Sequence, residues 1–547
     1  MALDSARGRV RVNLNAGLVA RNPNLRQVGL SLAGVSLGES AFAVALAVYA
    51  YGAGGATAVG VVGLVCLLPS AVTVPLGSWF GDRHERERVL VALALASAAA
   101  LGACTVVFYY LDRSEAAIFV LAGAQAALAS LMWPVATALL PSLATTPSEL
   151  IAANSASSTV DGLGTLAGPL VAGILIATTS PGVVFAVASG AFLWAAVMVT
   201  GIRVEGRIRL GAEPGRELLA GLRLILRNRE AATVTGLFCA QTFVRGLLNV
   251  LVVVTSFRLL HAGGGWVGYL TAAMGVGGLL GGLGSATLAG RRLAGPFALG
   301  LLAWGVPIAL LAAAPYRVSA LLLLALVGAG NALEDVAGET LLQRLVDDQV
   351  LARVVGLSYG IAMALAGIGS ILAPALIAGL GTRGALVATG CVLPALVLVS
   401  FQRLRRIDAG AAAPLAELEL LQAVPIFAPM SVAAKEQVAA RIVPVSAPAG
   451  STIIREGDIG DRFYVIVSGL ASVTMGGRPL SDRGPGEYFG EIALLRNVPR
   501  TATITAREDT ELRAVERDDF LAAVTGHSLS RSEAETIVEE RLATAAP

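Results

Sequence analysis

The residues best suited to bind a ligand lie in a short run near the C-terminus, where a glycine, a carboxylate and a guanidinium stand close together. Phe489-Gly490 is typical of a tight turn, and a short helix is predicted to follow it. Free N–H groups at the start of a helix can bind an anion, and the Arg500 guanidinium offers a fork of donors that suits phosphate oxygens. The Glu491 carboxylate would have no role in a site that binds phosphate alone, but it can accept a hydrogen bond from a sugar hydroxyl. The run therefore predicts a site for a phosphate joined to a sugar, as in a nucleotide.

The residues around this run predict the small domain that must hold it. A short helical stretch covers 415–421, and a second one ends near Ile442. From there onward, glycines and alternating apolar residues are typical of short antiparallel strands. We expect a linker and connecting helix over 405–422, followed by an α+β domain with a β-roll over 423–547.

The rest of the chain is far more apolar than a soluble protein. Of 547 residues, 55% are hydrophobic and 14% are charged. Apolar runs of about 20 residues are long enough to cross a bilayer. We predict an all-α membrane protein with two pseudo-symmetric six-helix halves, over 27–202 and 232–404. The twelve predicted spans are 28–52, 58–80, 88–111, 116–140, 158–178, 183–202, 232–260, 266–289, 293–315, 317–340, 355–380 and 384–402.

The arginines predict the orientation of these spans. They gather in the N-terminal tail 1–26, in the connection 203–231 between the halves, and after the last span. Basic residues favour the cytoplasmic side of a membrane. We therefore expect a multi-pass protein of the cell's inner (plasma) membrane, with both termini and the C-terminal domain in the cytoplasm.

Two features suggest that the halves arose by duplication. The run from Gly164 to Pro169 matches the run from Gly369 to Pro374 at a constant offset of 205 residues. Glu39 in the first span and Arg245 in the seventh are 206 residues apart, so they occupy nearly equivalent places. Duplicated transporters bind their substrate between the two repeats.

Charges inside a membrane span are costly, at ~3 kcal/mol or more, and tend to face a cavity or a partner. We hypothesise that Glu39 and Arg245 face each other across a central pathway. The alternative is that each only snorkels or bridges two helices. Further candidates for the pathway are Gln125, Asp161 and Asn331, whereas Glu334 and Asp335 are expected to be solvated at the cytoplasmic end of the tenth span.

The loop after the second span resembles the cytoplasmic loop signature of the major facilitator superfamily. Asp82, Arg83 and Arg86 match the signature, and Ser78 and Glu85 replace its two glycines. The resemblance implies that these three charged residues latch one conformation and that the halves alternate access to a central site. Judged by their chemistry alone, these residues could instead form a solvated cluster of charges at the surface.

The fifth span resembles a second signature, found in superfamily members that export drugs or siderophores in exchange for protons. Residues that match it or replace it with small side chains are Ser157, Gly164, Gly168, Pro169, Ala172 and Gly173. Small residues at this spacing also serve to pack helices closely. The signature therefore suggests export but does not name a substrate.

The run 489–503 resembles the phosphate-binding cassette of cyclic-nucleotide-binding domains. By that resemblance Glu491 would hold the ribose 2′-hydroxyl and Arg500 the cyclic phosphate, and the backbone around Gly490 would complete the cradle. Thr501 could favour cyclic GMP, but the family as a whole favours cyclic AMP, so the base stays open. The complete expected site is Phe489, Gly490, Glu491, Ile492, Ala493, Arg500, Thr501 and Ala502.

Other classes of function have little support. Neither a nucleophile with its base nor a phosphate-loop lysine is evident, so we do not expect an enzyme, and the four cysteines lack the spacing of a zinc site. The chain after His527 is too short for a helix-turn-helix reader of nucleic acid. We expect no cofactor and no metal.

Together these patterns suggest a secondary active transporter that exports small amphipathic molecules with proton coupling. Cytosolic cyclic nucleotide, cAMP in preference to cGMP, would regulate it allosterically. The alternative is a transport-dead membrane sensor that relays nucleotide level to a partner protein. The Leu-rich flanks of the soluble domain could also form a homodimer.

Overall fold

The structure is a computed structural model, and it divides into two compact units, with the chain passing from the first to the second between Arg405 and Arg406. It describes residues 22–81, 86–111, 114–143, 147–202, 228–285, 292–346, 348–410, 415–430, 432–439, 441–525 and 528–545.

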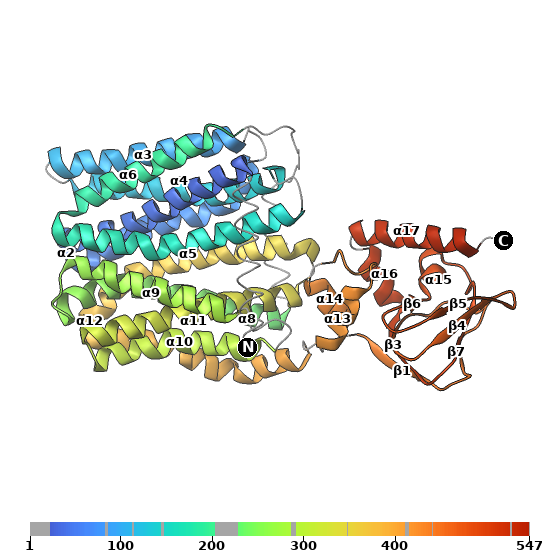
Figure 1. Cartoon of the computed structure of the whole chain (residues 1–547). Helices are drawn as coiled ribbons and strands as arrows, with labels where there is room; N and C mark the ends of the chain where they lie inside the picture. The colour runs from blue at the N-terminus through green and yellow to red at the C-terminus, as the bar shows by residue number, and fades with distance from the viewer. Residues whose placement is uncertain are drawn as a thin grey trace. The chain divides into compact units, whose positions relative to one another are not determined.

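The N-terminal unit is a bundle of long helices. Ten helices of the described chain are long and apolar enough to cross a membrane. Figure 1 shows α2–α6, in blue to cyan, gathered on one side of the bundle and α8–α12 on the other. Their bounds are α2 Pro23–Gly81, α3 Arg86–Tyr110, α4 Glu115–Leu143, α5 Pro147–Thr178, α6 Pro181–Val199, α8 Arg229–Val254 with a π-helical end η1 Thr255–Leu259, α9 Gly264–Ser285, α10 Ala294–Ala313, α11 Arg317–Leu345 and α12 Asp348–Gly410.

Glycines break the two longest helices. In α2 the break falls at Gly54 and Gly55, and Gly55 has a φ of 64°. In α12 it falls at Gly381, with a φ of 70°. The apolar part of α12 covers 54 residues, or roughly 80 Å of helix, whereas a bilayer core is about 30 Å thick. Each of these two helices therefore provides two segments of spanning length.

Small residues pack helices together within each half in matching ways. A Cβ on Gly164 of α5 would lie 3.0 Å from the Ser36 carbonyl carbon of α2. In the other half, Gly369 of α12 lies in the same kind of contact with Phe243 and Leu247 of α8. The two matching sequence runs therefore perform matching packing roles, because neither interface has room for a larger side chain.

The contacts between the halves include α5 with α9 and the second segment of α2 with α12. Gly173 of α5 meets Gly268 of α9, where a Cβ on Gly173 would lie 3.2 Å from the Gly268 Cα. Gly60 in the second segment of α2 meets Ser370 of α12, with 2.6 Å from such a Cβ to the Ser370 carbonyl oxygen. These contacts lie toward the end of the bundle at which the Gly55 and Gly381 breaks also lie.

The C-terminal unit is a two-sheet β-roll flanked by short helices. The sheets have strand orders β1-β8-β3-β6 and β2-β7-β4-β5, and every pairing is antiparallel. The expected short antiparallel strands are confirmed. The elements are α13 Leu415–Ala423, α14 Val432–Ala439, β1 Val443–Ala447, β2 Thr452–Ile454, β3 Arg462–Ser468, β4 Ala471–Met475, β5 Arg478–Arg483, β6 Tyr488–Phe489, α15 Glu491–Arg496, β7 Thr503–Ala506, β8 Thr510–Glu516, α16 Arg517–Thr525 and α17 Ser528–Ala545.

Two apolar clusters hold this unit together. One joins the flanking helices to the roll, and at its centre the rings of Phe463 and Phe520 stack with 4.8 Å between centroids. The other fills the roll, where Tyr464 of β3 stacks on Phe489 of β6 at 5.3 Å. Phe489 therefore anchors the turn that follows β6 to the interior of the roll.

Candidate functional site

The Arg500 guanidinium lies inside the C-terminal unit and holds the predicted turn in place. Its side chain is 3% exposed. Nη1 donates to the Gly490 carbonyl oxygen at 2.9 Å, and Nη2 donates to the Arg462 carbonyl oxygen at 2.7 Å. Nη2 also lies 3.1 Å from the Asp461 carboxylate. The sequence did not indicate Asp461 or the Arg462 carbonyl, because both lie almost 40 residues before Arg500.

The turn at Gly490 requires a glycine. Gly490 is the N-cap of α15 and has a φ of 95°, a left-handed conformation that favours glycine. A Cβ there would lie 2.7 Å from Arg500 Nη1. The turn and the guanidinium are therefore in direct contact, and any larger residue would push them apart.

The Glu491 carboxylate is buried beside this turn, with 1% of its residue surface exposed. Its Oε1 accepts a hydrogen bond from Arg541 Nη1 at 2.7 Å. Its Oε2 has no hydrogen-bond partner among the described residues. One oxygen thus fixes the side chain, and the other is available to accept a hydrogen bond.

Arg541 was not predicted from the sequence. It lies on α17, also donates from Nη1 to the Tyr488 carbonyl oxygen at 3.1 Å, and places its Cζ 4.5 Å from the centroid of the Tyr488 ring. A cation over an aromatic ring is favourable. Only the fold joins Arg541 to a residue 50 positions earlier, so no local pattern could have identified it.

The remaining predicted residues line the same region. Ala493 is buried in α15, and Ile492 is half-buried beside it. Thr501 and Ala502 are half-buried after Arg500, whose N–H donates to the Asp458 carbonyl oxygen at 2.8 Å. The structure therefore gathers all eight predicted residues of 489–502 around one turn and one loop.

Another carboxylate, Glu487, stabilises the turn that precedes β6. Burial alone would raise its pKa, but the Gly484 N–H at 2.8 Å and Arg483 at 2.6 Å outweigh burial and lower that pKa below the ordinary 4.5. Glu487 is therefore charged at neutral pH and fixes the turn before β6.

In the helical unit, Glu39 and Arg245 do not form an ion pair within the described chain. Arg245 Nη2 donates to Asn331 Oδ1 at 2.5 Å, and its Cζ lies 5.8 Å from the Trp304 ring centroid. On the helix that carries Glu39, Ser36 donates from Oγ to Asp161 Oδ1 at 3.0 Å. The predicted pathway residues therefore form two groups, one in each half.

The burial of Glu334 contradicts our expectation for this residue. We expected a solvated carboxylate, but Glu334 is 0% exposed, and neither of its oxygens has a hydrogen-bond partner in the described residues. The cause is Gly300 of α10, where a Cβ would lie 2.8 Å from the Glu334 Cβ, so α10 covers this face of α11. The sequence position near the end of a span gave no indication of this cover.

The other pathway and latch residues are placed as follows. Gln125 is buried in α4, and its Nε2 has no partner among the residues that the structure covers. Arg86 is the first residue of α3. Asp82 and Arg83 lie outside the described residues.

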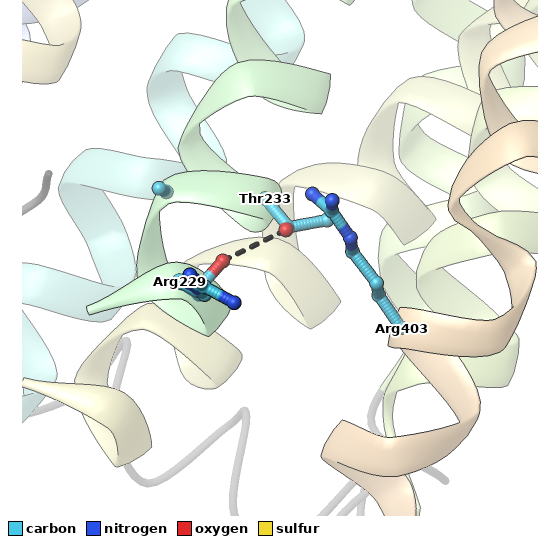
Figure 2. A pocket seen from close by; sticks show the side chains of 4 residues that line it. Arg229, Thr233 and Arg403 are labelled. Atoms are coloured by element: carbon cyan, nitrogen blue, oxygen red, sulfur yellow. Dashed lines mark hydrogen bonds between the residues drawn. The ribbon is translucent and has the colours of Figure 1, made fainter. Parts of the chain in front are cut away.

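A basic pocket lies at the start of α8. It is lined by Arg229, Ala232, Thr233 and Arg403. Figure 2 shows the Arg403 side chain extending from α12 toward Thr233, whose Oγ1 donates to the Arg229 carbonyl oxygen at 2.8 Å. The pocket therefore brings two guanidinium groups from α8 and α12 to one end of the bundle.

Comparison with known families finds a matching family model in each unit. The family model for the Major Facilitator Superfamily matches residues 28–299, and the model for the cyclic nucleotide-binding domain matches residues 444–527. The chain is a fusion of these two domains. The second match covers the turn at Gly490 and both polar anchors, so the buried site lies in the cyclic nucleotide-binding domain.

Individual relatives match this domain. The chain is 37% identical over 123 residues to a cAMP-dependent protein kinase regulatory subunit of Aspergillus niger, covering 22% of this chain and 28% of that one. It is 35% identical over 102 residues to a cyclic nucleotide-gated potassium channel of Rhizobium etli, covering 19% and 28%. The chain thus spans only about a quarter of the length of these curated relatives.

Solved structures also match this chain, over a share similar to that covered by the curated relatives. The regulatory domain of Toxoplasma gondii PKA with cAMP is 25% identical, with a TM-score of 0.22, covering 27% of this chain and 56% of that one. The Thermus thermophilus catabolite activator protein is 32% identical, with a TM-score of 0.21, covering 22% and 60%.

Proposed function

We propose that the chain is a secondary active transporter whose cyclic nucleotide-binding domain regulates it through Glu491 and Arg500. One observation supports this most: a buried carboxylate with one unoccupied oxygen and a buried guanidinium flank the same glycine turn. In this proposal Glu491 Oε2 accepts the ribose 2′-hydroxyl, and Arg500 donates to the cyclic phosphate. Relatives named as cAMP-dependent support cAMP as the preferred ligand, and Thr501 is the residue that would contact a guanine base.

The transporter domain works by alternating access in this proposal. In this proposal the chain crosses the membrane twelve times in two six-helix halves, with α2 and α12 each crossing twice. The breaks in these two helices support this, and the matching Gly164 and Gly369 contacts support the equivalence of the halves. The halves are joined near the Gly55 and Gly381 breaks, where Tyr51 also stacks on Phe257 at 4.4 Å. With both termini cytoplasmic, that end faces outward, so the described conformation is closed to the outside. Small amphipathic molecules leave the cell in exchange for protons.

Coupling between the domains has a thermodynamic condition. Cyclic nucleotide shifts the transporter only if it binds one of the transporter's conformations more tightly than the other. The alternative function, a sensor without transport, keeps the nucleotide site and loses flux. Only a flux measurement separates the two.

We propose to test this with the full chain in proteoliposomes that carry a proton gradient. We expect efflux of an amphipathic dye to depend on the gradient and to change with cAMP on the side of the soluble domain. Arg500→Gln should retain basal flux and lose the response to cAMP. Arg507→Gln, which alters an exposed arginine paired with Asp482 in the same domain, is the matched control and should behave as wild type. Gradient-independent dye movement in every protein would overturn the transport proposal.

A further inference from the structure

The basic pocket at the start of α8 has no part in nucleotide binding or in the proposed transport pathway. Its volume is about 220 Å³, well above the roughly 15 Å³ that one water molecule requires. It is smaller than the pockets that hold drug-sized ligands, which begin at about 300 Å³. Because Arg229 and Arg403 line it, the pocket suits a small group that carries negative charge.

Neither guanidinium of the pocket is neutralised within the part of the chain that the structure describes. Arg229 and Arg403 are both exposed, and neither forms an ion pair there. No carboxylate of the described residues lines the pocket. Two like charges that border one space repel each other, and an anion between them would remove that cost. Arginine presents its donors as a planar fork that fits the oxygens of a phosphate group.

The other polar groups at this end of α8 already have partners. Thr233 Oγ1 donates to the Arg229 carbonyl oxygen at 2.8 Å. Asn228 caps the helix, since its Oδ1 accepts from the Glu230 N–H at 3.0 Å, and its Nδ2 donates to the Leu345 carbonyl oxygen at 3.1 Å. The guanidinium groups are therefore the donors that the pocket offers to a ligand, so its selectivity would rest on charge.

An exposed apolar face adjoins the pocket on α12. Val399 is 82% exposed and stands four residues before Arg403, on the same face of the helix. Leu398 and Phe401 beside it are also exposed. This segment belongs to a helix that is apolar enough to cross a membrane, where such side chains lie against lipid chains. Arg403 therefore lies where the hydrocarbon of a bilayer meets the headgroups.

We propose that the basic pocket binds the phosphate group of an anionic phospholipid. Arg229 and Arg403 hold the phosphate oxygens, and the acyl chains lie along the apolar face at Val399. A soluble phosphate compound shares the chemistry of the headgroup but has no chains to cover this face. Basic pockets between helices at the cytoplasmic side of a membrane suit such headgroups, and this end of the bundle is cytoplasmic in the orientation proposed above. The inference does not depend on the transported substrate.

The test compares ligands that differ in charge and in acyl chains. Binding of dioctanoyl-phosphatidylglycerol, dioctanoyl-phosphatidylcholine and glycerol 3-phosphate to the purified full chain is measured by titration calorimetry at one concentration of nonionic detergent. We expect the anionic lipid to bind about tenfold more tightly than the zwitterionic lipid, whose choline the arginines repel, and more tightly than glycerol 3-phosphate. Arg229→Gln and Arg403→Gln should each weaken binding of the anionic lipid about fivefold.

The matched control is Arg405→Gln, which removes the same charge from the same end of α12. Arg405 does not line the pocket, and its Cζ lies 5.8 Å from the Phe401 ring centroid. The control should bind the anionic lipid as wild type does, and unchanged thermal midpoints show that the variants are folded.

Three results would overturn the inference. Equal binding of the two lipids would show that charge does not select the ligand. Wild-type affinity in Arg229→Gln and Arg403→Gln, or an equal loss in Arg405→Gln, would place the binding outside the pocket. Glycerol 3-phosphate binding as tightly as the anionic lipid would assign the pocket to a soluble phosphate compound instead of a lipid.

Discussion

Arg541 near the end of α17 donates from Nη1 to Glu491 Oε1 at 2.7 Å, although 50 residues separate them along the chain. The same guanidinium bonds to the Tyr488 carbonyl oxygen, so the last helix is fastened to both sides of the Gly490 turn. The carboxylate that would hold the ribose is therefore oriented by a residue outside the predicted run.

This ion pair predicts an effect on stability. Arg541→Met leaves a buried carboxylate without its partner, which costs about 3 kcal/mol and should lower the thermal midpoint of the nucleotide-binding domain by roughly 10 °C. Adding Glu491→Gln removes the uncompensated charge and should restore most of the loss. Calorimetry on the full chain measures both. A double variant no more stable than Arg541→Met would show that the pair does not act as described.

Asp461 should tune nucleotide affinity rather than stability. Its side chain is 66% exposed and lies 3.1 Å from Arg500 Nη2, and exposed ion pairs add little to stability. Its carboxylate repels an incoming phosphate, so Asp461→Asn should tighten cAMP binding about threefold, with a smaller gain at high salt. Titration of both proteins at low and high salt checks this. Weaker binding by the variant would mean that Asp461 positions Arg500.

Glu487 predicts a pH dependence. A carboxyl whose pKa is lowered on folding stabilises the fold above its unfolded-state pKa, near 4.5. It loses that contribution as pH falls through the lowered value. Glu487→Gln should therefore be less stable than wild type at pH 7, by under about 1 kcal/mol because the side chain is partly exposed, and equally stable in acid. Exposed Glu508→Gln is the control. A difference that grows on acidification would contradict this assignment.

The stacked rings of Tyr51 and Phe257 predict a reporter of conformation. Cysteines at these positions, in a chain lacking Cys66, Cys104, Cys239 and Cys391, should cross-link when the halves are closed at this end. Cyclic nucleotide should change the cross-linking rate if it biases alternating access. The change should vanish with Arg500→Gln. A rate that responds equally in both proteins would place the effect outside the nucleotide site.

Short sequence patterns predicted the helices and strands well. Apolar runs at 293–315 and 317–340 correspond to α10 and α11, and the predicted gap between the first two spans coincides with the Gly54–Gly55 break. Glycine and alternation also indicated the strands. These features follow from hydrophobicity and backbone conformation, which a short window of sequence contains.

The side-chain partners could not be predicted in the same way. Arg541 and Asp461 reach the nucleotide site from distant segments. Glu334 is buried because Gly300 lets α10 approach it, and Asn331 occupies the position opposite Arg245 that we assigned to Glu39. Each of these depends on which helix faces lie together, and periodicity in a single chain does not determine that.

The most direct test is cyclic nucleotide binding to the purified full chain by titration calorimetry, with wild type, Arg500→Gln and the Arg507→Gln control side by side. Because hydrogen bonds from a charged group to a ligand contribute about 1.5–3 kcal/mol, we expect Arg500→Gln to lose roughly 100-fold in affinity. The control should retain wild-type affinity, and cAMP should bind more tightly than cGMP. Equal affinity in wild type and Arg500→Gln, or no binding by wild type, would contradict the assignment of the site.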